Sequence, residues 1–525
     1  MRWKNLAAGL ALLIAATAVR LPALPAGLPY MSYVDEGHVL HHVLHLLVKR
    51  TWEPDNYSYG SLPFYLIAGA VLAWSPGYAA LHGRPLAGDL SPSPYQYYDF
   101  VEPVDVVVIG RLVTLVFSLG VVALTGLLAW RLAGPAAGLF AAWLAALVPA
   151  LVARSAIVNI NPLVVFFALA ALYFAEGARN APGDGRPRRD AALAGAMTGL
   201  AAATKYPAVL VCLPVVLAIV LAQAAWTEKF RRLLLAGGAA VAALLLAMPA
   251  LVLRPAKVMA AAHEMSQTYG TQEIGGYWDQ AVHRAEWDLP LEHPEVGIVF
   301  LVLAAAGLAV ALRDRRWSRA AWGWLLFAAA TGLLVAPYKF RAFRNLLALV
   351  PLGCVLAALL FAAIRRRLSR PSRQRALDLA AALLPAVLFA PALYQYSASQ
   401  FHLEDSRTAA LRWLAHHAQA DQRILFAEEL AFLPSRIESL PSETAVRPWE
   451  KAWNRIWNRR FNYLVLGEMV TPGGQPLILP SMREWILQNY RLEASFGSEI
   501  GLPGPFLLKG NRQIIYILRR VPPPS

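Results

Sequence analysis

Two adjacent carboxylates, Asp35 and Glu36, follow closely after the first long apolar segment of the chain. Ionisable side chains beside a membrane-embedded segment are costly, and in a membrane protein they usually mark a functional site. A carboxylate at a membrane edge can accept a proton from a hydroxyl group, because partial desolvation raises its pKa towards a useful value. The pair equally fits the start of a helix, where acids favour the helix dipole. One acid can act as the base while the other caps the helix.

Four histidines, His38, His41, His42 and His45, follow the acid pair at helical spacing. They predict the polar face of an amphipathic helix whose other face is made of Val and Leu. Histidines four residues apart can chelate a metal, but no cysteine or clear extra acid accompanies them. The pattern therefore favours a helix in the membrane interface. We expect no metal and no other cofactor, with a divalent metal as the alternative.

Further polar groups stand at turns between apolar blocks. Lys339, Arg341 and Arg344 lie among aromatic residues. These three cations suit a lipid phosphate, because Arg offers forked hydrogen bonds, whereas an aromatic–basic belt that anchors the protein to headgroups is the alternative. The other candidates for substrate binding, also at turns, are Tyr59, Asn161, Lys205 and Tyr206.

The composition identifies the class of protein. Of the 525 residues, 58% are hydrophobic and only 15% are charged, whereas a soluble protein carries about 25% charged residues. The apolar residues form long blocks, so the chain is an integral membrane protein with many spans. The net charge of +15 comes from Arg clusters between those blocks, which is typical of cytoplasmic loops and not of a nucleic-acid-binding protein.

Eleven apolar blocks predict transmembrane helices. The first is interpreted as a retained span, with a cleaved signal peptide as the alternative. The blocks are 6–19, 106–130, 135–152, 162–178, 191–204, 208–225, 233–253, 296–312, 320–336, 346–364 and 377–394.

Segment 62–81 is also apolar, and the positive-inside rule decides its place. If it crossed the membrane, the Arg clusters of the later loops would all move to the outside. We therefore expect a helix along the outer surface, a cytoplasmic N-terminus, and an external acid pair. From about residue 396 helical and strand-like stretches alternate, which predicts a small α/β domain outside the membrane. The predicted domains are 1–395 and 396–525.

Val34-Asp35-Glu36-Gly37 after the first span resembles the C-type (GT-C) glycosyltransferases that use polyprenyl-phosphate sugars. This group, families 39 and 83, includes protein O-mannosyltransferases and lipid A aminoarabinose transferases. The resemblance covers roughly residues 1–395. Further matching stretches, in the same order, are Gly110-Arg111-Leu112, Arg131-Leu132-Ala133-Gly134, Gly199-Leu200, Thr204-Lys205-Tyr206 and Arg344-Asn345-Leu346-Leu347 through Pro351.

The resemblance implies a GT-C fold with helices on the outer surface and an inverting transfer of a hexose or pentose. It further implies a polyprenyl-phosphate sugar as donor, Asp35 as the general base, and an envelope protein, lipid or glycan as acceptor. The expected location is the bacterial inner membrane. One residue departs from the family pattern: Asn161 precedes Pro162 where members often have Asp. Asn161 can hydrogen-bond a substrate, but it cannot act as a base or as a metal-binding carboxylate.

Two other functions compete with this interpretation. A flippase or transporter of lipid-linked saccharides needs polar residues spread through the spans, whereas the span interiors here are mainly Ala, Leu and Val. A structural component of an envelope complex is the third alternative. No nucleotide-binding loop is present in the sequence, so transport driven by ATP finds no support.

Overall fold

The computed structural model describes residues 3–31, 34–90, 101–179, 186–269, 296–336, 343–401, 406–427, 432, 434–447, 461–467, 480–496 and 515–521. Contacts divide the chain into two compact units. The bundle unit comprises Met1–Leu24, His42–Leu90 and Val108–Tyr394. The tail unit comprises Pro25–His41, Ser91–Val107 and Gln395–Ser525. Two segments of the first long loop therefore group with the tail of the chain, and one of them contains the acid pair.

The described residues include eight helices that are long and apolar enough to cross a membrane, judged by length and composition. They are α1 (Trp3–Arg20), α3 (Leu62–His82), α5 (Asp105–Ala133), α8 (Asn161–Ala178), α11 (Trp226–Ala247), α16 (Ser318–Val335), α17 (Leu349–Arg367) and α18 (Pro371–Phe401). Shorter apolar helices are α6 (Pro135–Leu147), η2 (Tyr206–Val211) with α10 (Cys212–Val220), and α15 (Ile298–Arg313). This confirms a polytopic α-helical membrane protein.

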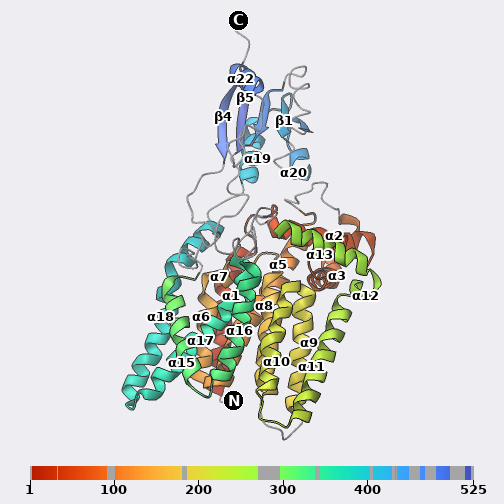
Figure 1. Cartoon of the computed structure of the whole chain (residues 1–525). Helices are drawn as coiled ribbons and strands as arrows, with labels where there is room; N and C mark the ends of the chain where they lie inside the picture. Colours follow the sequence, from red (N-terminus) through yellow and green to blue (C-terminus); the bar gives the residue numbers. More distant parts are fainter. Residues whose placement is uncertain are drawn as a thin grey trace. The chain divides into compact units, whose positions relative to one another are not determined.

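The remaining helices are mostly short or lie beside the spans. They are η1 (Leu21–Ala23), α2 (Val34–Lys49), α4 (Leu86–Asp89), α7 (Pro149–Val152), α9 (Arg186–Thr204), α12 (Ala250–Leu253), α13 (Pro255–Tyr269) and η3 (Phe343–Leu346). Each of the eleven predicted spans coincides with a helix. Figure 1 shows α3 and α13 running across the direction of α9 and α11, as expected of helices on a membrane surface. The number of helices that cross stays a prediction.

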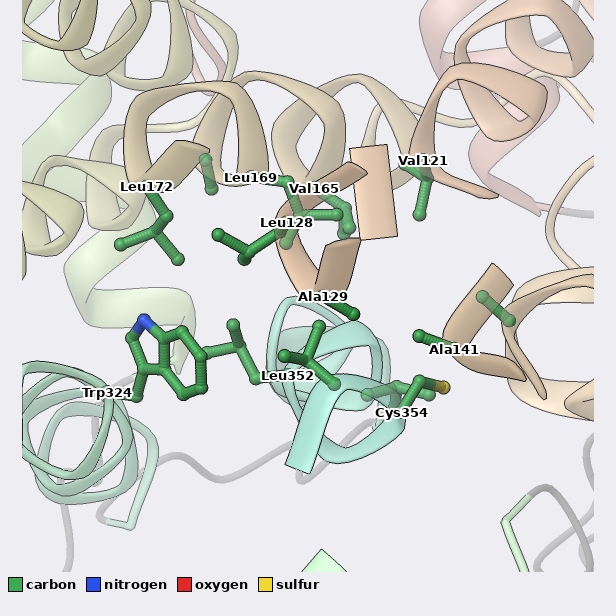
Figure 2. Packing of buried hydrophobic residues seen from close by; sticks show 14 of the residues in the cluster. Val121, Leu128, Ala129, Ala141, Val165, Leu169, Leu172, Trp324, Leu352 and Cys354 are labelled. Carbon is green, nitrogen blue, oxygen red and sulfur yellow. The ribbon is translucent and has the colours of Figure 1, made fainter. Parts of the chain in front are cut away.

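Small residues let the bundle helices approach closely. A Cβ atom added at Gly195 or Gly199 of α9 would lie 1.9 Å or 2.2 Å from a carbonyl oxygen of α11. Gly307 of α15 meets the backbone of α17 in the same way. Without a hydrophobic driving force between helices in lipid, such backbone contact is what stabilises their association. Figure 2 shows the apolar interior around Leu128, where side chains of several helices interdigitate.

Charged side chains gather at the C-terminal end of α8. Arg131 donates to the carbonyl oxygen of Tyr173 at 2.9 Å, and the buried Arg232 donates to that of Ala178 at 2.7 Å. Arg232 thereby satisfies the last carbonyl group of α8, which has no partner within the helix. Glu228 in turn accepts a hydrogen bond from Arg232 Nε at 3.1 Å. The basic clusters therefore lie at the end of α8 opposite to Asn161.

The tail domain is a five-stranded mixed sheet with helices. The strand order is β2-β1-β3-β5-β4, in which β1 is parallel to β2 and β3 whereas β5 is antiparallel to β3 and β4. The strands are β1 (Arg423–Ala427), β2 (Glu443–Arg447), β3 (Tyr463–Leu466), β4 (Tyr490–Phe496) and β5 (Ile515–Arg520), and the helices are α19 (Ser406–His417), α20 (Pro434–Glu438) and α22 (Pro480–Asn489). Buried residues of α19 and the strands share one apolar core. This confirms the predicted small α/β domain.

Candidate functional site

Three turns of the bundle unit meet at the ammonium group of Lys205. Lys205 follows α9 directly and adopts an extended conformation that ends the helix. Its Nζ donates hydrogen bonds to Asn161 Oδ1 at 3.2 Å and to Asn345 Oδ1 at 2.9 Å. Asn161 is the first residue of α8, and Asn345 belongs to η3. We call Asn161, Lys205 and Asn345 the polar cluster.

The amide orientations in the polar cluster follow from their partners. Asn161 donates through its backbone N and its Nδ2 to Asn159 Oδ1, at 2.8 Å and 2.7 Å. Its Oδ1 is thereby left to accept from Lys205. In Asn345 the Oδ1 atom faces Lys205, while the buried Nδ2 atom has no hydrogen-bond partner among the described residues. Lys205 and Asn345 together therefore offer N–H groups to an anion, since an ammonium group and an amide nitrogen are both donors.

Tyr206 follows Lys205 of the polar cluster directly in the chain and contacts the segment that contains Tyr59. The Tyr206 hydroxyl donates to the carbonyl oxygens of Tyr57 and Tyr59, at 2.7 Å and 3.3 Å. Gly60 lies so close to α9 that a Cβ atom there would be 1.9 Å from the carbonyl oxygen of Ala203. These contacts fix the Tyr57–Tyr59 segment beside the end of α9. The point of close approach, Ala203, lies two residues before Lys205.

An ion cluster ties the loop that carries this segment to α13. Glu53 accepts from Arg254 Nε at 2.7 Å and from Lys257 Nζ at 2.9 Å. The hydrogen bond from Lys257 and that from Arg254 lower the pKa of Glu53, against the opposing effect of desolvation. Burial raises the pKa of Tyr57 to about 12. The loop is thus held by the ion pairs of Glu53 and by the hydrogen bond from Tyr206 to the carbonyl oxygen of Tyr57. At physiological pH Glu53 is ionised and Tyr57 is neutral.

An apolar cavity of about 280 Å³ adjoins η3 in the bundle unit. It is lined by residues of α15, α16, α17 and η3, among them Phe300, Trp324, Ala328, Phe343 and Leu346. Trp324 and Leu352, which both line it, project towards each other's helices in Figure 2. Because η3 supplies Asn345 to the polar cluster and Phe343 and Leu346 to the cavity, a cationic site and an apolar cavity share one short turn.

A second cation contacts η3. The guanidinium of Arg154 lies 5.9 Å from the centroid of the Phe343 ring, within the range of a cation–π interaction. Arg154 is half-buried and also donates to the carbonyl oxygen of Ala150 at 3.1 Å. The positive charge around η3 is therefore not confined to Lys205.

The acid pair belongs to the tail unit. Asp35 and Glu36 are the second and third residues of α2, so both lie in its first turn. Glu36 is fully buried. The side chain of Asp35 lies outside the described part of the structure, as does Tyr33 before it. A fully buried carboxylate at a helix start is consistent with both the capping and the chemical interpretation.

The histidines of α2 do not form a solvated face. His42 is buried against the ring of Phe64, with 4.7 Å between ring centroids, and its Nδ1 atom forms a hydrogen bond with Asp55. His38, His41 and His45 are half-buried. The expected interfacial helix is thus more deeply packed than its alternating polarity indicated, because Asp55 provides a partner for a buried histidine. The metal prediction stays untested.

The structure brings together some of the predicted site residues and leaves others outside its description. Asn161 meets Lys205, and Tyr206 meets Tyr59. Arg344 is half-buried in η3 next to Asn345, whereas Lys339 and Arg341 lie outside the described residues. Sequence reasoning missed Asn345 and Arg154 as candidates. Asn345 was signalled by its place in the Arg344-Asn345 stretch, but no sequence pattern connected Arg154 to η3.

The bundle of long helices, the crosswise helices and the small α/β tail domain define a GT-C fold, and the comparisons with known proteins agree. Residues 104–253 match the family model described as dolichyl-phosphate-mannose-protein mannosyltransferase. No curated protein sequence matches the chain. The predicted GT-C fold is confirmed by the likeness to the solved structures that follow.

Solved structures are similar in fold. ArnT from Cupriavidus metallidurans bound to undecaprenyl phosphate aligns with a TM-score of 0.57 at 13% identity, covering 97% of each chain. The same protein in the apo state gives a TM-score of 0.51 at 13% identity, with 97% of this chain and 98% of that chain covered. The Archaeoglobus fulgidus oligosaccharyltransferase in the apo form gives 0.51 at 13% identity, with 89% and 70% covered. At these identities the likeness establishes the fold alone.

Proposed function

We propose that this chain transfers a sugar from a polyprenyl-phosphate donor to an acceptor of the cell envelope. The observation that carries the proposal is η3, where donors for an anion and an apolar cavity adjoin. A polyprenyl phosphate has the same division into a charged head and a hydrocarbon chain. The similarity in fold to a protein crystallised with undecaprenyl phosphate supports this choice of donor.

In this proposal the polar cluster binds the donor phosphate. Lys205 and the Nδ2 atom of Asn345 offer N–H groups to the phosphate oxygens, and Arg344 of η3 supplies further positive charge, as do Arg341 and Lys339 in the prediction from the sequence. Hydrogen bonds to a charged group are the strong ones. The first isoprene units of the chain occupy the cavity lined by Phe343 and Leu346. Tyr59, Tyr206 and Asn161 bind the sugar.

The reaction forms one bond and breaks one at the anomeric carbon. The acceptor oxygen bonds to this carbon as the carbon–oxygen bond to the phosphate breaks, and the electron pair of that bond leaves with the phosphate. Asp35 takes the proton of the acceptor hydroxyl as the general base, and Glu36 orients Asp35 or caps α2. Attack opposite to the leaving group inverts the anomeric centre. Charge grows on the phosphate during this step, so the cations stabilise the transition state more than the bound donor.

The topology of this proposal places the reaction on the outer face of the membrane. The charged ends of α8, α9 and α11 face the cytoplasm, because the basic loops adjoin them, and the start of α8 at Asn161 faces outwards. The N-terminus is then cytoplasmic, and the tail domain is periplasmic or extracellular, in a bacterial inner membrane. The donor sugar is a hexose or a pentose, and the acceptor is an envelope protein, lipid or glycan.

The proposed reaction needs no metal cofactor. The leaving phosphate is neutralised by side-chain cations, and Asn161 stands where family members often have an acid that could hold a metal. Treatment with EDTA is therefore expected to leave transfer unchanged. A loss that Mg²⁺, Mn²⁺ or Zn²⁺ restores would contradict this part of the proposal.

The experiment that tests the function uses membranes from cells that lack this chain, since these supply the native acceptor. Purified protein is added with undecaprenyl-phosphate mannose, glucose or 4-aminoarabinose, and the release of undecaprenyl phosphate is measured by mass spectrometry. One donor is expected to release lipid phosphate and to add its sugar mass to an envelope component. Translocation of an intact donor without release would instead support a flippase, and neither outcome with any donor would favour a structural component.

A further inference from the structure

A buried pair of side chains joins the tail domain to the segment before the acid pair. The guanidinium of Arg407, in the first turn of α19, lies 3.8 Å from the centroid of the Tyr30 ring. Only 2% of Arg407 and 1% of Tyr30 is exposed. Both residues belong to the tail unit. A cation–π contact is stronger when both groups are removed from water, as they are here.

Arg407 is firmly held at its own end. It shares one face of α19 with Leu411 and Leu414, four and seven residues further along, and both leucines belong to the core that α19 forms with the sheet. Ala410 of the same helix turn is fully buried in that core. The helix that carries the guanidinium is therefore fixed by the apolar core of the tail domain.

Tyr30 is held in a turn a few residues before the acid pair. Its backbone N–H donates to the carbonyl oxygen of Gly27 at 2.9 Å, in a turn, and the neighbouring Met31 is 1% exposed. Helix α2 begins at Val34, so Tyr30 lies only five residues before Asp35. Tyr30 is thus close in sequence to the first turn of α2, and both belong to the tail unit.

We propose that Arg407 is a positioning residue that holds Tyr30 and thereby the start of α2, and that the tail domain thus belongs to the catalytic apparatus. This inference rests on the proposed function, in which Asp35 is the base. A leucine at this position of α19 would bury apolar surface as well, whereas a planar guanidinium stacked on a ring also fixes the orientation of that ring. The contact suits positioning because misplacing a catalytic group by about 1 Å can cost about 100-fold in rate.

The test compares substitutions at both ends of the contact in the full-length chain. Arg407→Met and Tyr30→Leu are each expected to lower kcat about 10- to 100-fold in the release assay, while KM for the donor stays within about twofold, because the polar cluster of the bundle unit is unchanged. Tyr30→Phe keeps the ring and Arg407→Lys keeps the charge, so both are expected to retain more activity. The matched control is Arg412→Met, at an exposed position of the same helix.

Combination with a base variant separates positioning from a general loss of folded protein. If Arg407 acts through the acid pair, Arg407→Met should lower the residual rate of Asp35→Asn little further. A loss of folded protein would instead multiply the two effects, and that result would overturn the inference. Normal transfer by Arg407→Met beside an impaired Asp35→Asn would also overturn it while leaving the proposed function intact.

Hydrogen exchange supplies a readout that requires no donor. In Arg407→Met, peptides from residues 25–41 are expected to exchange faster, while peptides of β1 and β3 keep their protection. Unchanged exchange in 25–41 would refute the positioning role even if none of the donors in the panel supports transfer. Unchanged activity in both Asp35→Asn and Glu36→Gln would reject the base assignment instead, whatever the exchange shows.

Discussion

The bundle unit and the tail unit each bury polar side chains, but the two sets differ in chemical character. In the bundle unit, the Lys205 ammonium donates to two neutral amides, and Arg154 stacks near Phe343 of η3. In the tail unit, the carboxylate of Glu36 is fully buried at the start of α2, and Arg407 contacts an aromatic ring. One unit thus carries buried cationic and amide groups, and the other carries a buried acid as well as a buried cation.

In the proposed function, donor binding and proton transfer therefore depend on separate parts of the chain. Substitutions in the polar cluster should change the affinity for a lipid phosphate, because the proposal places the anion there. Substitutions of the acids should change turnover with little effect on that affinity. The predictions below test this separation, beginning with the largest expected effect.

Asp35→Asn keeps the shape of the side chain and removes its basicity. General-base catalysis contributes about 10²- to 10⁴-fold in rate, so kcat should fall by about that factor while the Kd for undecaprenyl phosphate stays unchanged. Glu36→Gln should have a milder effect. The measurements are the release assay and native mass spectrometry of the bound lipid. An active Asp35→Asn beside an inactive Glu36→Gln would reverse the two roles.

The fold of the bundle was predictable because membrane spans obey simple rules of length and charge. Each of the eleven long apolar blocks overlaps at least one helix, whereas the placing of 62–81 on the outer surface stays a prediction. In the tail, the alternation of helical and strand-like stretches predicted an α/β domain, but the segments that form β2 and β4 carry no clear strand pattern. The segment Glu443–Arg447 carries charges at both ends, and the segment Tyr490–Phe496 alternates irregularly around a bulge. Pairing with neighbouring strands, which no local pattern reveals, makes them strands.

The site was only partly predictable for a related reason. Asn161 and Lys205 could be proposed because each stands at a turn between apolar blocks, yet nothing in the sequence showed that Asn345 would accept a hydrogen bond from Lys205. Arg407 shows the same limit. Its spacing from Leu411 and Leu414 marks a core position, but its partner Tyr30 lies near the other end of the chain.

Asn345→Asp tests whether the polar cluster of the bundle unit binds the lipid phosphate. The substitution is nearly isosteric and places a negative charge 2.9 Å from Lys205 Nζ, so it should oppose the phosphate. Lys205→Met removes a charged hydrogen-bond donor. Each of the two single variants should raise the Kd for undecaprenyl phosphate about tenfold or more. Native mass spectrometry measures the affinity.

Lys229→Met is the matched control for these two variants. Lys229 lies over the ring of Trp226 and donates to the carbonyl oxygen of Val220, outside the polar cluster, so its loss should leave the affinity unchanged. Equal effects of Lys229→Met and Lys205→Met would show that the phosphate responds only to net charge.

Ala328→Phe tests the apolar half of the donor site with a smaller expected effect. Ala328 lines the cavity beside η3, so a phenyl ring there should occupy the space of the isoprene chain. The affinity for undecaprenyl phosphate should fall several-fold, and that for a five-carbon prenyl phosphate should change less. Ala329→Phe is the control, since the next residue of α16 is exposed and does not line the cavity. If the two variants bind undecaprenyl phosphate with equal affinity, the cavity does not hold the isoprene chain.

The proposed donor site at η3 is tested most directly by a photochemical map of the bound donor lipid. An undecaprenyl phosphate that carries a diazirine on its first isoprene unit is irradiated with the full-length protein in lipid vesicles, and the labelled peptides are identified by mass spectrometry. We predict labelling of η3, α17 and the facing sides of α15 and α16, which an excess of unlabelled undecaprenyl phosphate abolishes. Labelling of lipid-exposed positions such as Leu246 of α11, unaffected by that competition, would contradict a donor site at η3.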